Sequence, residues 1–556
     1  MKKIKTRFLV LGLSMLSSFT LLSSCVNNDD TAITEPTRYT AQDIKSYSDL
    51  FDIFWTTMDQ RYVYFYEQKR RDGMDWSAIY KEYSPKFKAL KTFGRSTDND
   101  KEVNEDFLKA KQYFEEIIDP IIDRHFNVQI ALPATSNGVN FTATFYGGMI
   151  SEEPANRYPF VMKYGYMRSR LVPNSFNSVN YALGGYLSSN PDIYYFSFAQ
   201  FSLSQNYQIN LNDKYLNPDE GNGLVLTAER IDNSALLNTI TNLETRKKVR
   251  DFTVNILNQW NAFPKSADVT AFHDEIAKFK STEIVSDQFT SVAQNALTKS
   301  RSLVDYLSAS TYSSVTTTET IPYLNWFITE MNTHVTWGYR LPQFQDAAVA
   351  VINRGPLYKQ FLNPLHKGDI KKIIIDLRGN GGGAVVDARF FSDRFITKNE
   401  VFAYQRTKEG DGRFNYTPWV EAKTNPHKFG IPAHIPITIL TDKGSASMSE
   451  ITTLMLKSQG NDVVSVGDYS AGATAGLGGS DDFNGGTRDV IAGRLTFYMP
   501  LLAMKNAKGE VIEGIGVKPD IYVTPPTNEE LIAMQTSPTT FVDRVLNEAI
   551  KYLSSK

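Results

Sequence analysis

The chain of 556 residues contains one cysteine, Cys25, so a disulfide framework is excluded. It also lacks long basic runs: 59 Lys and Arg residues stand against 61 Asp and Glu residues, a formal net charge of −2. A nucleic-acid-binding surface needs clustered positive charge, so nucleic acid is not expected as a partner. Apolar residues make up 42% of the chain, which is enough for a large buried core in two or three domains.

The first 24 residues have the pattern of a secretory signal. Four cations lie within the first seven residues, a largely apolar run of about 15 residues follows, and Leu22-Ser23-Ser24-Cys25 ends the segment. A membrane-spanning helix needs about 20 apolar residues, so this run is too short for one. Without the signal the chain keeps 55 basic against 61 acidic residues, a net charge of −6. Residues 25–44 are mostly polar and are predicted to form a flexible tether.

Hydrophobic spacing predicts the organisation of the remaining chain. Apolar and aromatic residues recur every three or four positions from Phe51 to Tyr62, which indicates a helix with one buried face. The run Ile193 to Phe198 is typical of a strand, and residues 371–523 alternate strands with helices in an α/β pattern. The predicted segments are an N-terminal helical domain, a β-rich segment, a helical insertion, an α/β core and a C-terminal helix (45–127, 128–202, 203–355, 356–535 and 536–556).

A turn of small residues, Gly444-Ser445-Ala446-Ser447-Met448-Ser449-Glu450, follows the apolar strand 437–440 and opens a helix. Such a turn presents a serine hydroxyl, and the amides at a helix start favour a developing oxyanion. The alternative is structural. Ser447 and Glu450 have the spacing of a capping box, which only satisfies amides at the start of a helix.

A glycine-rich loop, Asp376-Leu377-Arg378-Gly379-Asn380-Gly381-Gly382-Gly383, follows the apolar strand 373–375. Consecutive glycines let a backbone approach a ligand closely and direct amides toward it. Gly379, Gly381 and Ala384 also have the spacing of a dinucleotide-binding fingerprint, which is the competing interpretation. No lysine of the Walker type follows, so a P-loop is excluded.

In this order, the two loops resemble the core of the S41 peptidases, the family of the C-terminal processing proteases and the tricorn core proteases. The resemblance covers 373–523 and implies a ClpP/crotonase-like α/β core that hydrolyses peptide bonds without a cofactor. It implies that Ser447 is the nucleophile. It also implies that the Met448 amide and one amide of Gly381 or Gly382 form the oxyanion hole.

Within this resemblance, Ser445 and Ser449 match non-catalytic neighbours of the nucleophile. Asp376 and Arg378 are expected to hold the glycine-rich loop by an ion pair rather than to act on substrate.

The base is not in the usual place. Processing proteases of the family use a lysine about 25 residues beyond the serine, and this chain has Gly472 or Ala473 at that position. Lys457 lies on the serine's own helix and is predicted to be solvated. A serine hydroxyl needs a neighbour that takes its proton, so another residue must supply the base.

The tricorn branch uses a histidine from an early Asp-Gly-His segment and a glutamate near the end of the domain. His125 lies in Asp123-Arg124-His125, which resembles that segment with arginine in place of glycine, and Glu513 begins a matching Glu-Gly segment. The resemblance therefore implies His125 as the base and Glu513 as the third member, with His334 in reserve. Arginine disfavours backbone angles that glycine allows. No histidine has metal-ligand spacing, so no metal is expected.

These patterns predict an exported serine peptidase that acts on peptides or unfolded proteins. The end of the signal resembles a lipobox, so Cys25 is expected to carry lipid and to hold the protein on the bacterial outer membrane, at its periplasmic or surface face. The alternative is an inactive S41-like scaffold that binds peptides or a membrane-protein partner. The missing lysine and Arg124 favour that alternative.

Overall fold

The computed structural model describes residues 39–95, 101–133, 140–148, 158–178, 181–221, 223–478 and 487–556. The predicted signal, Cys25 and most of the tether lie outside these residues, so export and lipid attachment stay predictions. Among the described helices, none is both long enough and apolar enough to cross a membrane. The fold divides into unit 1 (1–155, 401–422 and 471–516) and unit 2 (156–400, 423–470 and 517–556).

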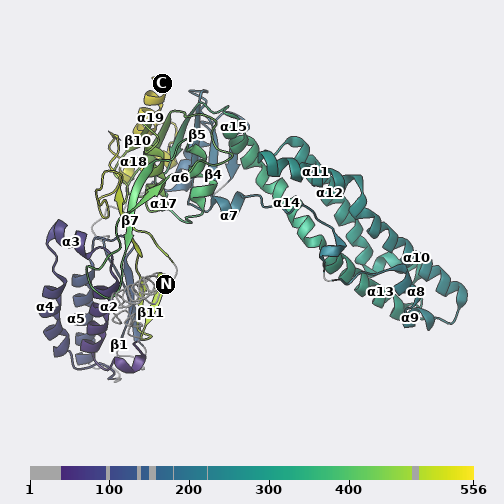
Figure 1. Cartoon of the computed structure of the whole chain (residues 1–556), viewed down its shortest axis with the longest axis horizontal. Helices are drawn as coiled ribbons and strands as arrows, with labels where there is room; N and C mark the ends of the chain where they lie inside the picture. The colour runs from purple at the N-terminus through teal and green to yellow at the C-terminus, as the bar shows by residue number, and fades with distance from the viewer. Residues whose placement is uncertain are drawn as a thin grey trace, which may run out of the picture. The chain divides into compact units, whose positions relative to one another are not determined.

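Unit 1 combines N-terminal helices with antiparallel strands drawn from three parts of the chain (Figure 1). Its four-stranded sheet has the order β11-β12-β1-β2, and a three-stranded sheet has the order β13-β7-β8. The helices are α2 (Tyr47–Arg61), α3 (Phe65–Asp72), α4 (Trp76–Ala89) and α5 (Lys101–Ile118). The strands are β1 (Asn127–Pro133), β2 (Asn140–Tyr146), β7 (Val401–Thr407), β8 (Val420–Lys423), β11 (Thr487–Ile491), β12 (Leu495–Tyr498) and β13 (Leu502–Asn506).

The aromatic stripe predicted from the sequence forms the core of unit 1. Phe51, Phe54 and Met58 of α2 are fully buried. The Phe54 ring lies 5.4 Å from the Phe114 ring of α5 and 6.0 Å from the Phe497 ring of β12, centroid to centroid. Each such side chain contributes about 1.5–3 kcal/mol through its burial, so α2 is held mainly by this face.

Unit 2 is built on a seven-stranded sheet with the order β14-β10-β9-β6-β5-β4-β3. The first five of these strands are parallel, and β4 and β3 are antiparallel to their neighbours. The strands are β3 (Phe176–Ser178), β4 (Ala182–Tyr186), β5 (Ile193–Phe198), β6 (Lys372–Asp376), β9 (Ile437–Thr441), β10 (Val463–Gly467) and β14 (Ile521–Tyr522). The helices outside the insertion are α6 (Phe160–Met167), α16 (Asp387–Phe390), α17 (Met448–Lys457), α18 (Asn528–Thr536) and α19 (Arg544–Ser554). The predicted α/β class with helical regions is confirmed.

The parallel pairing of β6 with β9 brings the two predicted loops together. Asp376 at the end of β6 lies opposite Leu440 of β9. Because parallel strands end at the same edge of a sheet, the glycine-rich loop and the serine turn leave that edge side by side. The residues 373–375 are fully buried, as expected for a central parallel strand.

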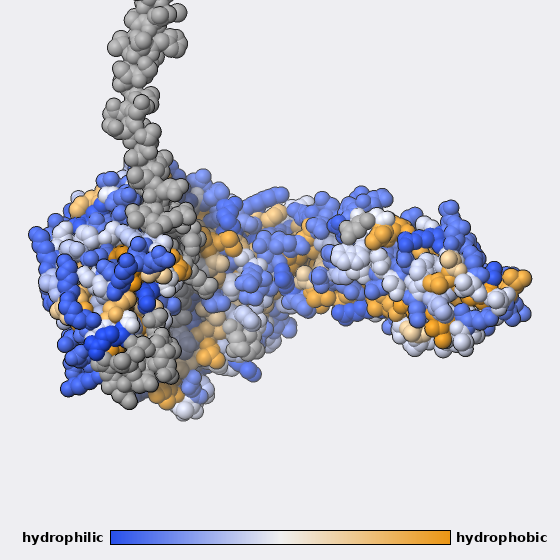
Figure 2. Space-filling view, turned by 90° about the horizontal axis from the view of Figure 1, so that it is seen from below, coloured by the Kyte–Doolittle hydropathy of each residue, from blue (hydrophilic) through white to orange (hydrophobic). Residues whose placement is uncertain are grey.

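The helices of the insertion run from Leu203 to Lys367, and a π-helical turn at 358–362 joins the last two of them. Figure 1 shows its long helices α10 to α14 lying alongside one another. On the face that Figure 2 shows, the described surface is mainly hydrophilic, with apolar residues scattered among polar ones. The insertion helices are α7 (Leu203–Tyr207), α8 (Ala228–Asp232), α9 (Ala235–Asn238), α10 (Leu243–Ala262), α11 (Ala267–Thr282), α12 (Asp287–Val304), α13 (Ile321–Thr333), α14 (Leu341–Leu357) and α15 (Asn363–Lys367).

Removing one aromatic ring from the core of unit 1 tests its role. Phe114→Ala leaves a cavity between α2 and β2, so we expect the free energy of unfolding to fall by about 3–5 kcal/mol in urea titrations. Leu108→Ala, on the same helix with a side chain 60% exposed, is the control, and its change is expected to stay within about 0.5 kcal/mol. Equal losses for the two variants would contradict the assigned core.

Candidate active site

Ser447 is held in a backbone conformation that a non-glycine residue rarely adopts. It directly precedes α17 with φ 54° and ψ −116°. Such a residue costs about 1–3 kcal/mol, which surrounding contacts must offset. The capping box is present, and Glu450 Oε2 accepts the Ser447 amide at 3.0 Å. A capping residue ordinarily has extended backbone angles, so the cap alone does not account for this conformation.

Gly382 packs directly against the serine turn. A Cβ atom at Gly382 would lie 2.6 Å from Ser447 Cβ, 2.7 Å from the Ala446 carbonyl oxygen and 2.8 Å from the Met448 nitrogen. Its φ of 92° is also one that glycine tolerates and other residues avoid. Only glycine therefore fits between the loop and the turn at this position.

The dinucleotide interpretation loses its structural basis. A pyrophosphate would need a helix start after the glycines, whereas α16 begins only at Asp387 and has four residues. The glycine-rich loop instead faces protein, because a Cβ atom at Gly383 would lie 2.3 Å from the Phe201 carbonyl oxygen.

Two backbone amides remain for an oxyanion hole. Gly382, one of the predicted donors, gives its N–H to Asn380 Oδ1 at 3.0 Å, so that group is already in use. The Met448 and Gly381 amides have no acceptor among the residues that the structure describes. Gly381 is exposed, with open space around the position of a Cβ atom. Met448 and Gly381 are thus the better candidates, and Gly382 serves to allow the close approach.

Hydrogen bonds brace the glycine-rich loop against the serine turn. Asp442 Oδ1 accepts the amides of Gly379 and Gly444, each at 2.8 Å. The Asn380 carbonyl accepts the Ser449 hydroxyl at 2.7 Å. Ser445 is likewise used within the scaffold, because its hydroxyl donates to the Leu377 carbonyl at 2.8 Å. The predicted non-catalytic serines therefore have structural roles.

A buried ion-pair network anchors the base of the loop. Arg378 donates to both oxygens of Asp543 at 2.9 Å and to Asp376 Oδ2 at 2.7 Å. Lys163, itself 1% exposed, lies 3.4 Å from Asp376 Oδ1. Burial alone would raise the pKa of Asp376, but the charges of Arg378 and Lys163 outweigh it and lower this pKa to about 2. The predicted ion pair is confirmed, and it belongs to a network that also includes Asp543 and Lys163.

Two described lysines of unit 2, Lys163 and Lys457, are both engaged elsewhere. Lys163 is committed to the network above, and burial lowers its pKa. Lys457, predicted to be solvated, is partly buried and pairs with Asp520 at 2.9 Å. Gly472 and Ala473, at the family's lysine position, belong to unit 1.

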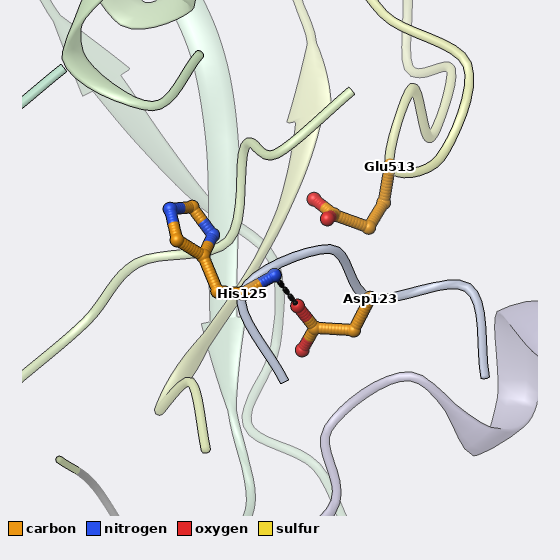
Figure 3. A group of neighbouring side chains, drawn as sticks. All are labelled: Asp123, His125 and Glu513. Atoms are coloured by element: carbon orange, nitrogen blue, oxygen red, sulfur yellow. Dashed lines mark hydrogen bonds between the residues drawn. The ribbon is translucent and has the colours of Figure 1, made fainter. Parts of the chain in front are cut away.

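Unit 1 contains the predicted base in a cluster of three titratable side chains, Asp123, His125 and Glu513 (Figure 3). One ligand-type atom from each lies within 4.8 Å of the others. Asp123 Oδ1 accepts the His125 amide at 2.9 Å and thereby shapes the turn. Arg124 lies outside the left-handed region and gives its amide to Glu513 Oε1 at 3.0 Å. Arginine in place of glycine is therefore accommodated.

Glu513 is fully buried and firmly held. Its Oε2 accepts the Thr474 amide at 2.7 Å, the Thr474 hydroxyl at 2.8 Å and the Ala475 amide at 3.0 Å. The segment at the family's lysine position therefore binds the Glu513 carboxylate in this chain. Sequence reasoning missed Thr474, and it quoted Asp123 within the motif of His125 without assigning it a role.

The imidazole of His125 is unprotonated at neutral pH, which is the form in which a histidine can accept a proton. Burial lowers its pKa from 6.5 to about 4, so the ring is neutral at pH 7. Figure 3 shows the Glu513 carboxylate pointing toward the ring, on the side of the nitrogen next to Cγ. That nitrogen, Nδ1, and Asp123 Oδ2 are buried without a hydrogen-bond partner among the described residues. Burial also raises the pKa of Asp123.

The types of side chain in this cluster also coordinate divalent cations. Both oxygens of Glu513 already accept hydrogen bonds, however. The function proposed below uses the cluster for proton transfer.

His334, the reserve candidate, has a structural role. It is fully buried in the helical insertion. Its Nδ1 accepts the Leu226 amide at 3.0 Å, and its Nε2 lies 3.0 Å from Asn261 Oδ1. With both ring nitrogens engaged, His334 is not available as a base.

Comparison with known proteins bears on the core region. Residues 338–523 match the model of peptidase family S41. The carboxy-terminal processing protease CtpB of Bacillus subtilis is 32% identical over 115 residues, 21% of this chain and 22% of that protein. A protein of Staphylococcus epidermidis named "Probable CtpA-like serine protease" is 30% identical over 171 residues, 30% of each chain. This chain thus spans less than a third of the length of these relatives.

Two solved structures are similar over most of the chain. A protein from Parabacteroides merdae has a TM-score of 0.46 at 14% identity, covering 92% of this chain and 97% of that one. Mature CPAF complexed with lactacystin has a TM-score of 0.41 at 9% identity, covering 92% and 99%.

The family match confirms the predicted resemblance to the S41 peptidases. The matched range includes the glycine-rich loop, Ser447 and Glu513, whereas His125 lies before it. Both relatives are named as proteases, and the Staphylococcus epidermidis protein is named a serine protease, which supports a serine-type peptidase.

Breaking the buried ion-pair network tests its importance. Arg378→Met leaves the buried Asp543 without its cation and Asp376 with Lys163 alone, so we expect the free energy of unfolding to fall by about 3–5 kcal/mol. The control is Arg250→Met, which removes an exposed pair with Asp232 and is expected to cost less than about 1 kcal/mol. A similar, small loss for both variants in urea titrations would show that the network does not anchor the loop.

Proposed function

We propose that the chain is an exported serine peptidase that hydrolyses peptide bonds through Ser447, with His125 as its base and Glu513 as the third member. The observation that carries the proposal is the partly buried imidazole, neutral at pH 7, beside a firmly held carboxylate, in a chain without lysine at the family's position. An imidazole that is neutral at pH 7 is ready to take a proton, whereas a lysine would first need its pKa lowered by several units.

In the proposed reaction, Ser447 Oγ bonds to the substrate carbonyl carbon as its proton passes to His125. The Met448 and Gly381 amides stabilise the oxyanion, and one such donor contributes about 3 kcal/mol in the transition state. The carbon–nitrogen bond then breaks as His125 returns the proton to the leaving amine. A water molecule next gives a proton to His125 and attacks the acyl group, which releases the carboxylic acid and restores Ser447.

In this reaction Glu513 stabilises the imidazolium that forms in each half of the cycle, and orients the ring, by accepting a hydrogen bond from Nδ1–H. The substrates proposed are peptides or unfolded proteins. The proposed location is the bacterial outer membrane, at its periplasmic or surface face, through lipid on Cys25; the sequence pattern of the first 25 residues supports it.

The second candidate function is an inactive scaffold that binds peptides or a membrane-protein partner. Its main support is the absence of lysine at Gly472 and Ala473. The hydrogen bonds from Thr474 and Ala475 to Glu513 give that segment another role, so the missing lysine does not itself imply inactivity.

Covalent labelling separates the two functions. We expect a fluorophosphonate probe to label the native full chain, because it reacts with activated serines. Ser447→Ala is expected to abolish labelling, while Ser458→Ala, at the far end of α17, leaves it unchanged. Absence of labelling in the native chain, measured by in-gel fluorescence and intact mass, supports the scaffold instead.

The pH dependence of kcat/KM tests the identity of the base. The base acts only when unprotonated, so activity falls as pH drops through the pKa of His125, which burial lowers to about 4. We therefore expect kcat/KM to be flat from about pH 8 to about pH 6 and to be lost only near pH 4. A midpoint near 6.5 would show an unshifted histidine and contradict the buried setting.

Two variants complete this measurement. His125→Ala is expected to lower kcat about 10²- to 10⁴-fold at pH 7, and His434→Ala, which removes an exposed imidazole, is expected to leave kcat unchanged. Full activity in His125→Ala would exclude His125 as the base.

A further inference from the structure

A cleft of about 340 Å³ lies in unit 1 next to the loops of the base cluster. Its lining includes Arg70 and Arg71 of α3 and Lys505 of β13. Ile122, directly before Asp123, and Ile515, two residues after Glu513, also line it. The cleft therefore shares its walls with both segments that carry the cluster.

The cleft holds positive charge that the protein does not neutralise. Glu67, its acidic lining residue, is paired with Arg406, whose Nη2 lies 2.6 Å and 2.8 Å from the two carboxylate oxygens. Arg70 and Lys505 have no carboxylate partner among the described residues; each instead lies over an aromatic ring, Lys505 at 4.1 Å from the Trp419 centroid. A carboxylate of a ligand would give these cations a charged partner.

The lowered pKa of Lys505 also fits a site for a negatively charged ligand. Burial lowers the pKa of Lys505, and Glu67 offsets part of this effect, while Arg406 and Arg70 lower this pKa further. Cations that face one another across partly buried space repel, so a carboxylate placed between them gains from both.

The walls of the cleft are apolar at its mouth. Tyr66 is 44% exposed and Ile515 is 43% exposed, so both place apolar surface beside the cations of the cleft. Apolar walls with a few fixed polar groups are typical of small-ligand sites. Together they suit a peptide segment that carries a carboxylate next to an apolar side chain.

Arg71 connects the cleft to the base cluster. Its Nη1 donates to the Glu513 carbonyl at 2.6 Å. A Cβ atom at Gly514 would lie 3.0 Å from this Nη1 atom and 2.9 Å from the Ile122 carbonyl oxygen. Glycine at 514 therefore allows Arg71 to pack on the loop that carries Glu513.

We propose that this cleft is a substrate subsite that binds a carboxylate of the peptide through Arg70 and Lys505, with Arg71 as its link to the loop of Glu513. The carboxylate comes either from an acidic side chain or from the peptide's C-terminus. The inference rests on the proposed function, because it treats the ligand of the cleft as the substrate of the peptidase.

Calorimetric binding to the full chain carrying Ser447→Ala tests the subsite without turnover. The probes are four acetylated hexapeptides of one apolar sequence, with Glu or Gln at a central position and a free or amidated C-terminus. We expect peptides with a carboxylate at the recognised position to bind about fivefold more tightly than the peptide with none, and this advantage to shrink at about 0.5 M salt. The peptide that gains identifies the source of the carboxylate.

Variants locate the effect. Arg70→Gln combined with Lys505→Gln is expected to remove the preference while leaving binding of the uncharged peptide unchanged. Lys69→Gln, on α3 but outside this lining, is expected to keep it. Equal binding of all four peptides, failure of all four to bind, or a preference that survives in the double variant overturns the subsite. Because binding is measured on Ser447→Ala, this result is independent of the labelling that tests catalysis.

Discussion

The contact between the backbone of Gly382 and the serine turn is the constraint on which the proposed active site depends. A side chain at Gly382 would collide with Ser447, so the loop and the turn coexist only with glycine there. The contact also fixes Ser447 in a positive-φ conformation that costs about 1–3 kcal/mol. Asp442 accepts hydrogen bonds from backbone amides of both segments. These bonds and the buried Arg378 network offset that cost. Strain at Ser447 is therefore maintained by a rigid scaffold beneath it.

A positioned hydroxyl is inert without a base, and the composition of one segment explains where the base is expected. The residues after Gly472 offer amides and the Thr474 hydroxyl instead of an ammonium group, and all of these bind Glu513. That carboxylate lies in one cluster with His125, whose neutral ring is the proposed proton acceptor. In the proposed function, the histidine cluster therefore supplies the base that lysine supplies in the processing proteases. The cationic cleft shares its walls with this cluster, and its proposed role is to bind a carboxylate of the substrate.

Local patterns predicted much of the fold and about half of the candidate site. The strand 373–375, the aromatic face of α2, the two loops and the Asp376–Arg378 pair all depend on residues close in sequence, which spacing reveals. Contacts between residues far apart in the sequence could not be predicted from local patterns. The ion pair of Asp543 with Arg378, for example, joins residues 165 positions apart. The burial of single side chains could not be predicted either. His334 was the reserve candidate for the base, but both of its ring nitrogens form hydrogen bonds. Lys457 was predicted to be solvated, but it pairs with Asp520. The compact units also combine distant segments, since β1 pairs with β12.

The central claim is that the imidazole of His125 takes the proton of Ser447. The most direct measurement is a crystal structure of the full chain after reaction with a fluorophosphonate, in which the adduct on Ser447 mimics the tetrahedral intermediate. We expect Nε2 of His125 to lie within about 2.6–3.2 Å of Ser447 Oγ or of an adduct oxygen, with Nδ1 directed at Glu513. An adduct with His125 beyond hydrogen-bond reach and a different basic group in its place would contradict it.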